Sequence, residues 1–196
     1  MPKIINDIES KLITTAEELF IEKGYDAVNI RLLAKTVGVA SGTVYNYFSS
    51  KENLYQAVLI DSWDKTMSLL NEILCEEISL NLRMKKFFET MYIEVENRKG
   101  LGGRVVLEEK KKKNVANETE EKLDHYMSRI KDMVIEMINA HDNLKSKIDD
   151  SERLANVLIG SFWMLQRHHT GQREENIKFI GNYLDIILGE HGSASH

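Results

Sequence analysis

The near absence of proline constrains this chain more than any other feature, because its 196 residues contain only one, Pro2, at the N-terminal end. Proline lacks a backbone N–H group and interrupts helices, so the rest of the chain can form long, unbroken helices. Apolar residues recur at intervals of three and four, which places them on one face of a helix. The alternation of apolar and polar residues that marks a half-buried strand is not seen. We therefore predict an all-α fold.

Glycines and capping residues divide the helical pattern into about nine segments. A first amphipathic helix runs from about Ile5 to Gly24, and a second is capped by Asn29 and stopped by Gly38. The remaining signals predict a third helix from Ala40 or Ser41, a fourth after a capping box of Ser49 and Glu52, a fifth along Met84–Val95, a short sixth around Val105–Leu107 after Gly100, Gly102 and Gly103, a seventh from Asn117 and Glu120, an eighth from Leu154 to His168 after Asp150, and a ninth along Ile177–Leu188. We expect a DNA-binding domain in residues 1–50, a larger domain in residues 51–190 and a disordered tail in residues 191–196.

Charge is distributed unevenly along the chain. The net charge of −5 is not that of a typical nucleic-acid binder, although 42% hydrophobic and 29% charged residues are ordinary for a soluble protein. Acidic residues concentrate in the first helix, and none lies between Val28 and Lys51. A surface free of carboxylates is what contact with DNA phosphates requires.

Cysteine usage and hydropathy point to the cytoplasm. The single cysteine, Cys75, cannot form a disulfide within the chain, which fits a reducing compartment. Because Leu74 and Ile78 are its neighbours, we expect Cys75 to be buried as a small hydrophobe. The N-terminus does not resemble a signal peptide, and the apolar stretches are shorter than the ~20 residues that a bilayer requires. We therefore expect a cytoplasmic protein with no membrane partner.

The sequence offers little support for catalysis. His168 and His169 are adjacent, so on a helix their side chains diverge by roughly 100° and cannot easily share one ion. Metal-ligand clusters, Gly-rich phosphate loops and paired catalytic carboxylates are missing from the pattern. We predict no cofactor, no metal site and no enzyme activity.

Two short helices joined by a tight turn at Gly38 have the layout of a helix-turn-helix. The second of them needs a buried side and an exposed side of small, polar groups that can enter a major groove about 12 Å wide. Val44 and Phe48, one turn apart, supply the buried side. The exposed side consists of Ser41, Gly42, Thr43, Tyr45 and Asn46, while Arg31, Lys35, Tyr47 and Lys51 are placed to bind phosphates.

The complete string of residues is more specific than the helix-turn-helix alone. It consists of Gly24-Tyr25, Leu33-Ala34, Gly38-Val39, Gly42-Thr43-Val44-Tyr45-Asn46-Tyr47-Phe48 and Ser50-Lys51-Glu52-Asn53-Leu54. In order and spacing this string resembles the DNA-binding domain of the TetR family of transcriptional regulators, over roughly Ile5 to Leu59. The resemblance implies an all-helical homodimer that binds duplex DNA through its N-terminal domain.

The same resemblance implies roles for individual residues. Tyr45 and Asn46 would contact bases, with Ser41, Thr43 and Arg31 assisting. Tyr47 and Lys51 would contact phosphates, and Asn29 would cap a helix and touch the backbone of the DNA. Asn29 stands where the family commonly has threonine, and Leu32 is apolar where the family is usually polar.

The C-terminal helices suggest a dimer interface and a ligand pocket. The predicted helices Leu154–His168 and Ile177–Leu188 are apolar around most of their circumference, so each must bury more than one face, and pairing with a second copy would do so. A two-fold dimer implies a palindromic operator. A stripe of methionine and aromatic residues at helical spacing is more often core than pocket, and with that alternative open the candidate pocket residues are Phe87, Met91, Tyr92, Tyr126, Met133, Met137, Phe162, Trp163 and Gln166.

The function predicted from the sequence is a DNA-binding transcriptional regulator, a repressor that an unknown small-molecule effector releases from its operator. Two alternatives stay open at this stage. One is a ligand-independent DNA-binding regulator controlled by a protein partner. The other is a helical small-molecule-binding protein that uses its helix-turn-helix only as a scaffold.

Overall fold

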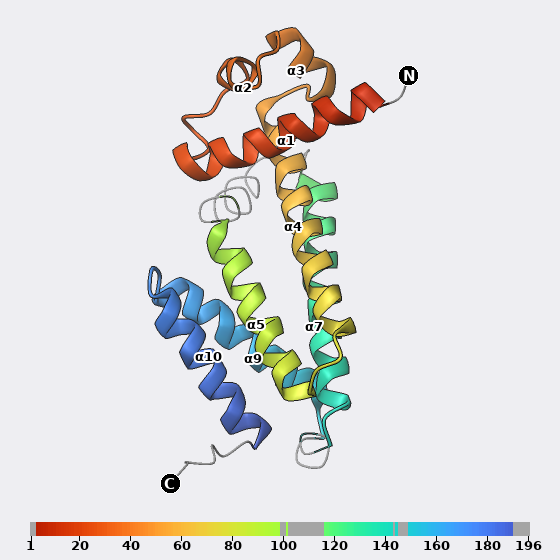
Figure 1. The fold of residues 1–196 in the computed structure, drawn as a ribbon, viewed down its shortest axis with the longest axis vertical. Helices are drawn as coiled ribbons and strands as arrows, with labels where there is room; N and C mark the ends of the chain where they lie inside the picture. The colour runs from red at the N-terminus through yellow and green to blue at the C-terminus, as the bar shows by residue number, and fades with distance from the viewer. Residues whose placement is uncertain (1–2, 99–100, 102–115, 143, 145–148, 190–196) are drawn as a thin grey trace. The chain divides into compact units, whose positions relative to one another are not determined.

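A computed structural model describes residues 3–98, 101, 116–142, 144 and 149–189 (Figure 1). Every regular element within these residues is a helix, which confirms the all-α prediction. The elements are α1 (Lys3–Lys23), α2 (Ile30–Val37), α3 (Ser41–Tyr47), α4 (Lys51–Cys75), α5 (Leu80–Asn97), α7 (Ala116–Asn139), α9 (Ser151–His168) and α10 (Arg173–Leu188). Eight helices are thus described where about nine were expected. The expected sixth segment around Val105–Leu107, with Gly100, Gly102 and Gly103 before it, lies outside the described residues, as does the tail.

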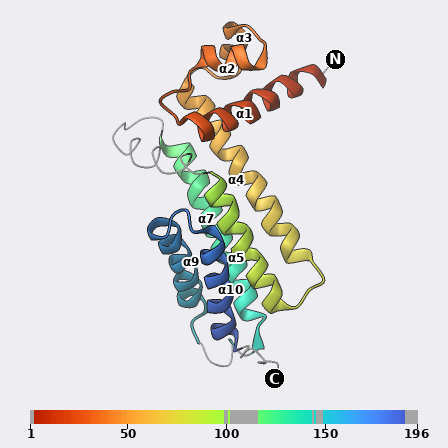
Figure 2. The same ribbon diagram turned by 60° about the vertical axis from the view of Figure 1, so that its left-hand side comes forward.

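The helices group into two compact units. The first unit comprises residues 1–65 and 98–123, and the second comprises residues 66–97 and 124–196. In the first unit α2 contacts both α1 and α3, so the three N-terminal helices form one cluster (Figures 1 and 2). In the second unit α5 packs against α9 and, more extensively, against α10.

The core of the first unit is built where the apolar faces of its helices meet. Three aromatic rings pack together there: Tyr55 of α4 lies edge to face on Phe20 at 5.1 Å and on Tyr25 at 4.9 Å, measured between ring centroids, and Phe20 stacks on Tyr25. The hydroxyl of Tyr55, a buried side chain, donates to the carbonyl of Leu101, which is itself fully buried. These contacts bury large apolar area and fix α4 against α1, which stabilises the platform that carries α2 and α3.

The core of the second unit joins α5 to α9 and α10 through both apolar and polar contacts. Tyr92 is fully buried, and its ring packs edge to face on Phe162, 6.1 Å away between centroids. The side-chain amide of Asn176, also buried, donates to the Tyr92 hydroxyl and to the His169 carbonyl, each at 2.7 Å. Buried polar groups are expensive unless they are hydrogen-bonded, so this pairing specifies how the start of α10 sits on α5.

Several predicted helix boundaries are confirmed, and others need correction. Asn29 and Asp150 cap α2 and α9 as expected. The cap of α4 is Ser50 rather than Ser49: the Ser50 hydroxyl accepts from the Asn53 backbone N–H at 3.1 Å, and Glu52 instead accepts from the Tyr25 hydroxyl at 3.3 Å. α7 begins at Ala116, so the expected cap Asn117 lies inside the helix.

The expectation that Cys75 is buried was wrong, because its side chain is exposed. Leu70 and Ile73 point into the core, and on a helix Cys75 is rotated by about 200° from Ile73, onto the opposite side. Within the part of the chain that the structure describes, no helix combines the length and apolarity needed to cross a bilayer.

Candidate functional site

The first short helix of the candidate DNA-binding surface, α2, is fixed at both ends by its sequence. Asn29 has an extended backbone, and its side-chain oxygen accepts from the Leu32 N–H at 2.9 Å, which satisfies one of the free donors at the start of α2. Gly38 has φ of +82°, a left-handed conformation that favours glycine, and its N–H donates to Ala34. The chain therefore turns sharply between α2 and α3.

The second short helix, α3, has the two sides that the sequence predicts. Val44 is fully buried and Phe48 is 5% exposed, so this side holds α3 on the core of the first unit. On the outer side Gly42 and Asn46 are exposed, and Tyr45 is 55% exposed. Ser41, Thr43 and Tyr47 are half-buried. The exposed aromatic ring of Tyr45 and the neighbouring side-chain amide of Asn46 together form a surface suited to contacting base edges.

A hollow of about 520 Å³ beside α3 brings together residues from three helix ends. Arg31 and Lys51 contribute positive charge to it, and the N-termini of α2 and α4 add the partial positive charge of their unpaired N–H groups. Its lining residues are Asn29, Ile30, Arg31, Tyr45, Ser49, Ser50 and Lys51. An anion such as a phosphate fits this chemistry.

Aromatic and acidic neighbours orient Lys51 within this hollow. The Lys51 Nζ lies 4.0 Å from the centroid of the Tyr25 ring, which attracts the ammonium group through its π face. Because the Tyr25 hydroxyl donates to Glu52, that carboxylate is engaged on the Tyr25 side. The sequence missed Ser49 and Ser50 as site residues. Their position at the start of α4 is the signal that could have found Ser50, since N-cap residues border helix N-terminal anion sites.

Most of the nine residues predicted to line a ligand pocket are packed into the core of the second unit. Phe87, Tyr92 and Phe162 are at most 2% exposed. Met133, Met137 and Tyr126 are also buried, and Gln166 donates to the Tyr92 carbonyl at 2.9 Å. A methionine and aromatic stripe at helical spacing packs the interior of this unit.

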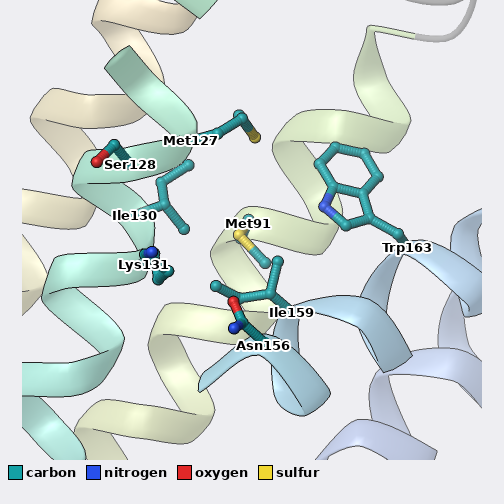
Figure 3. A pocket seen from close by; sticks show the side chains of 8 residues that line it. All are labelled: Met91, Met127, Ser128, Ile130, Lys131, Asn156, Ile159 and Trp163. Carbon is teal, nitrogen blue, oxygen red and sulfur yellow. The ribbon is translucent and has the colours of Figure 1, made fainter. Parts of the chain in front are cut away.

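Met91 and Trp163, the other two of the nine, line a hollow of about 310 Å³ between α5, α7 and α9 (Figure 3). Trp163 is 37% exposed, whereas Met91 lies almost fully buried at the base. The full lining is Met91, Met127, Ser128, Ile130, Lys131, Asn156, Ile159 and Trp163. The sequence did not single out Lys131 and Asn156, because an exposed Lys or Asn on an amphipathic helix is indistinguishable from an ordinary solvated residue.

The outer faces of α9 and α10 expose large apolar side chains. Val157 and Met164, two turns apart on α9, are 56% and 58% exposed. On α10, Phe179 is 53% and Ile186 is 73% exposed, and Phe179 stacks on Tyr183 with centroids 6.1 Å apart. In each helix the two residues are seven positions apart and so share one side, and large apolar side chains exposed in this way mark a candidate interaction surface.

Comparison with known proteins bears on both units. Residues 12–58 match the family model described as "Bacterial regulatory proteins, tetR family". The HTH-type transcriptional regulator YuxN of Bacillus subtilis is 32% identical over 84 residues, which are 43% of this chain and 29% of YuxN. The HTH-type transcriptional repressor KstR2 of Rhodococcus jostii is 28% identical over 83 residues, 42% of this chain and 41% of KstR2. The chain spans less than half the length of these curated relatives.

Solved structures resemble the fold over nearly the whole chain. A TetR/AcrR family transcriptional regulator from Thermobifida fusca superposes with a TM-score of 0.73 at 18% identity, covering 96% of this chain and 100% of that protein.

Three N-terminal helices with a tight turn at Gly38 form a helix-turn-helix, and a larger helical unit follows them in the chain. Residues 12–58 thus match the model of the tetR family of bacterial regulatory proteins, and the fold is shared with a solved TetR/AcrR family regulator. The two curated relatives and the solved structure are all named as transcriptional regulators.

Proposed function

We propose that this protein is a dimeric DNA-binding repressor that a small-molecule effector releases from a palindromic operator. The observation that carries the proposal is the outer side of α3, where Tyr45 and Asn46 are exposed beside a hollow that holds Arg31 and Lys51. In this proposal the outer side of α3 enters the major groove, and the hollow receives a backbone phosphate.

Roles for the individual residues follow from this placement. Asn46 pairs its amide with a base edge, and Tyr45 contacts a neighbouring base or thymine methyl. Ser41, Gly42 and Thr43 allow close approach at the start of α3, where a larger or acidic side chain would be repelled. Asn29, Arg31, Tyr47 and Lys51 contact phosphates and fix the register without reading sequence.

Dimerisation is proposed through the exposed apolar faces of α9 and α10. Val157 and Met164 of one copy, with Phe179 and Ile186, would be buried by the same residues of the second copy. A two-fold interface of this kind is self-complementary, so one apolar patch on each copy is sufficient. The resulting dimer carries two reading heads, which is why the operator is expected to be palindromic.

The direction of the response is also part of the proposal. KstR2, one of the relatives, is a repressor, and in this protein the hollow lined by Met91 and Trp163 is the effector site. An effector can change DNA affinity only if it binds the two states of the protein unequally. We therefore expect the effector to bind more tightly to free protein than to protein on its operator.

The experiment that tests DNA binding is selection of bound duplexes from a random-sequence pool by the full chain. The proposal predicts enrichment of an inverted repeat whose half-sites are centred about one or more helical turns apart. A pool that stays random after repeated rounds would refute it.

The phosphate hollow has its own test within the same system. On the selected duplex, the slope of log binding constant against log salt concentration should become shallower in Lys51→Met, by about one for each phosphate contact that is lost. Lys11→Met, which removes an exposed lysine from α1, is the matched control and should leave the slope unchanged. Equal slopes for the two variants would remove Lys51 from the interface.

A further inference from the structure

The hollow between α5, α7 and α9 has a polar end and an apolar end (Figure 3). Lys131 of α7 and Asn156 of α9 lie at the polar end, where the Lys131 Nζ is 3.0 Å from the carboxylate of Glu152, one turn before Asn156. Met127 and Trp163 lie at the other end. Asn156 and Trp163 are seven residues apart on α9, so the two ends are separated by about 10 Å along the helix.

The surface between these ends is apolar and adaptable. Met91 and Ile130 form a floor that is at most 2% exposed, and Ile159 and Met127 form the walls. Methionine side chains adjust to irregular shapes, and the indole ring of Trp163 offers a flat apolar face. A hydrocarbon segment laid along this floor would be removed from water over most of its length.

The charge of the hollow has one sign. Among the described residues that line it, Lys131 is the only charged one, and Ser128 and Asn156 are neutral groups that can donate hydrogen bonds. Glu152 pairs with Lys131 from outside the lining and is 63% exposed, while Lys131 is 33% exposed. An ion pair that is this accessible to water contributes about 1 kcal/mol or less. A carboxylate held among apolar walls can therefore displace Glu152 as the partner of Lys131.

From this arrangement we infer that the hollow binds an elongated amphipathic carboxylate. The carboxylate pairs with Lys131 and accepts from the Asn156 amide, and the apolar tail lies over Met91 towards Trp163. The volume of about 310 Å³ is near the lower limit of known ligand sites, which selects a ligand of medium length. This inference rests on the proposed function, since it names the chemical class of the effector.

Ligand binding here is compatible with the proposed dimer. Asn156, Ile159 and Trp163 follow one another at spacings of three and four, so they share one side of α9. Val157 and Met164 lie on a different side, since each follows a pocket residue by one position and is rotated from it by about 100°. A bound ligand and a second copy can thus occupy α9 together.

The test compares octanoate, 1-octanol and octylammonium, which share a tail and differ in head-group charge. Each is titrated into the full chain without DNA, and binding is followed by calorimetry and by the change in tryptophan fluorescence that Trp163→Phe should abolish. We expect octanoate to bind at least tenfold more tightly than 1-octanol, and octylammonium to bind most weakly.

Variants of Lys131 separate charge recognition from simple apolar binding. Lys131→Met should reduce the preference for octanoate over 1-octanol to about one, and Lys131→Glu should reverse the order in favour of octylammonium. Lys178→Met, which removes an exposed lysine from α10, is the control and should keep the tenfold preference. Equal affinities for the three probes, a preference that survives Lys131→Met, or the absence of binding by all three would overturn the inference.

The two proposals fail in different ways. If octanoate binds but does not lower affinity for the selected duplex, the ligand site stands and its coupling to DNA is refuted. If duplex binding is intact while all three probes fail to bind, the carboxylate site is refuted and the DNA-binding proposal stands.

Discussion

Ile186→Asp tests the proposed dimer most sharply, because among the described residues Ile186 is the most exposed large apolar side chain and the substitution places a charge there. Ile186 is 73% exposed in the single chain, so the substitution removes few contacts within the fold. Complete burial of an isoleucine side chain contributes about 1.5 to 3 kcal/mol. The exposed three quarters of Ile186 can therefore contribute about 1 to 2 kcal/mol per copy on dimerisation.

Two-fold symmetry doubles this effect, since each dimer contains the substitution twice. The loss of about 2 to 4 kcal/mol corresponds to a rise in the dimer dissociation constant of roughly 30-fold to several hundred-fold. Burying two unpaired carboxylates opposes association further, so these values are lower limits.

Sedimentation velocity over a range of protein concentrations measures the dissociation constant directly. The matched control is Leu82→Asp, which makes the same chemical change at a 52% exposed position on α5 and should leave the constant within about threefold. Far-ultraviolet circular dichroism checks that both variants keep their helices. If Ile186→Asp and Leu82→Asp dimerise equally well, the assignment of the α9 and α10 face to the dimer is refuted.

Further predictions concern local stability. Asn29→Ala should destabilise the first unit by about 1 kcal/mol in urea unfolding, because the Leu32 N–H loses its acceptor, whereas Asn29→Asp should change it by only a few tenths. Gly38→Ala should cost about 1 kcal/mol or more in the same assay, because φ is +82° there; an unchanged midpoint would contradict the left-handed turn. Tyr92→Phe should cost about 1 to 2 kcal/mol in thermal unfolding, because the buried Asn176 amide loses one acceptor, and a neutral result would mean that this hydrogen bond contributes nothing. Burial alone lowers the pKa of Lys65, but hydrogen bonds to Asp61 and Glu17 and the charges of these carboxylates outweigh it and raise the pKa above 10.5. A pKa that is higher in the folded than in the unfolded state means that protonated Lys65 stabilises the fold. This stabilisation is complete below about pH 10 and is lost as the pH rises through the pKa of Lys65 in the folded state. The small difference in unfolding free energy between wild type and Lys65→Met should therefore disappear in strong alkali.

The sequence predicted those parts of the fold that depend on local chemistry. The side chain of Asn29 is suited to capping the start of a helix, and the backbone of Gly38 is suited to the left-handed turn after one. The two ends of α2 could therefore be assigned from these two residues alone. The buried pair Val44 and Phe48 follows from helical spacing, and the exposed Tyr45 and Asn46 follow from the same spacing.

Features that depend on competition between neighbouring residues could not be assigned in this way. Ser49 and Ser50 each have a polar residue three positions later, and the choice between them was settled by the path of the chain after Phe48 and by Tyr25, which engages Glu52. Cys75 is exposed because Leu70 and Ile73 turn the opposite side of the end of α4 towards the core. Its apolar neighbours in the sequence, Leu74 and Ile78, did not predict this orientation.

The candidate ligand site shows the same limit at the level of tertiary packing. Phe87, Tyr92 and Phe162 are residue types that often line pockets, but packing between segments that are distant in the sequence buries them in the core. Lys131 and Asn156 acquire a shared surface only because α7 and α9 lie beside each other, which no pattern within either helix encodes.

Sequence-specific DNA binding through α3 can be measured by fluorescence anisotropy of the selected duplex. The wild-type chain, Tyr45→Ala and the control Ile21→Ala, an apolar residue 41% exposed on α1, are each titrated at several salt concentrations against the selected and a scrambled duplex. We expect tight, salt-sensitive binding to the selected duplex that Tyr45→Ala weakens at least tenfold and Ile21→Ala leaves intact, with equal residual affinity of all three for the scrambled duplex. Wild-type binding that does not distinguish the two duplexes, or that Tyr45→Ala leaves unchanged, would contradict it.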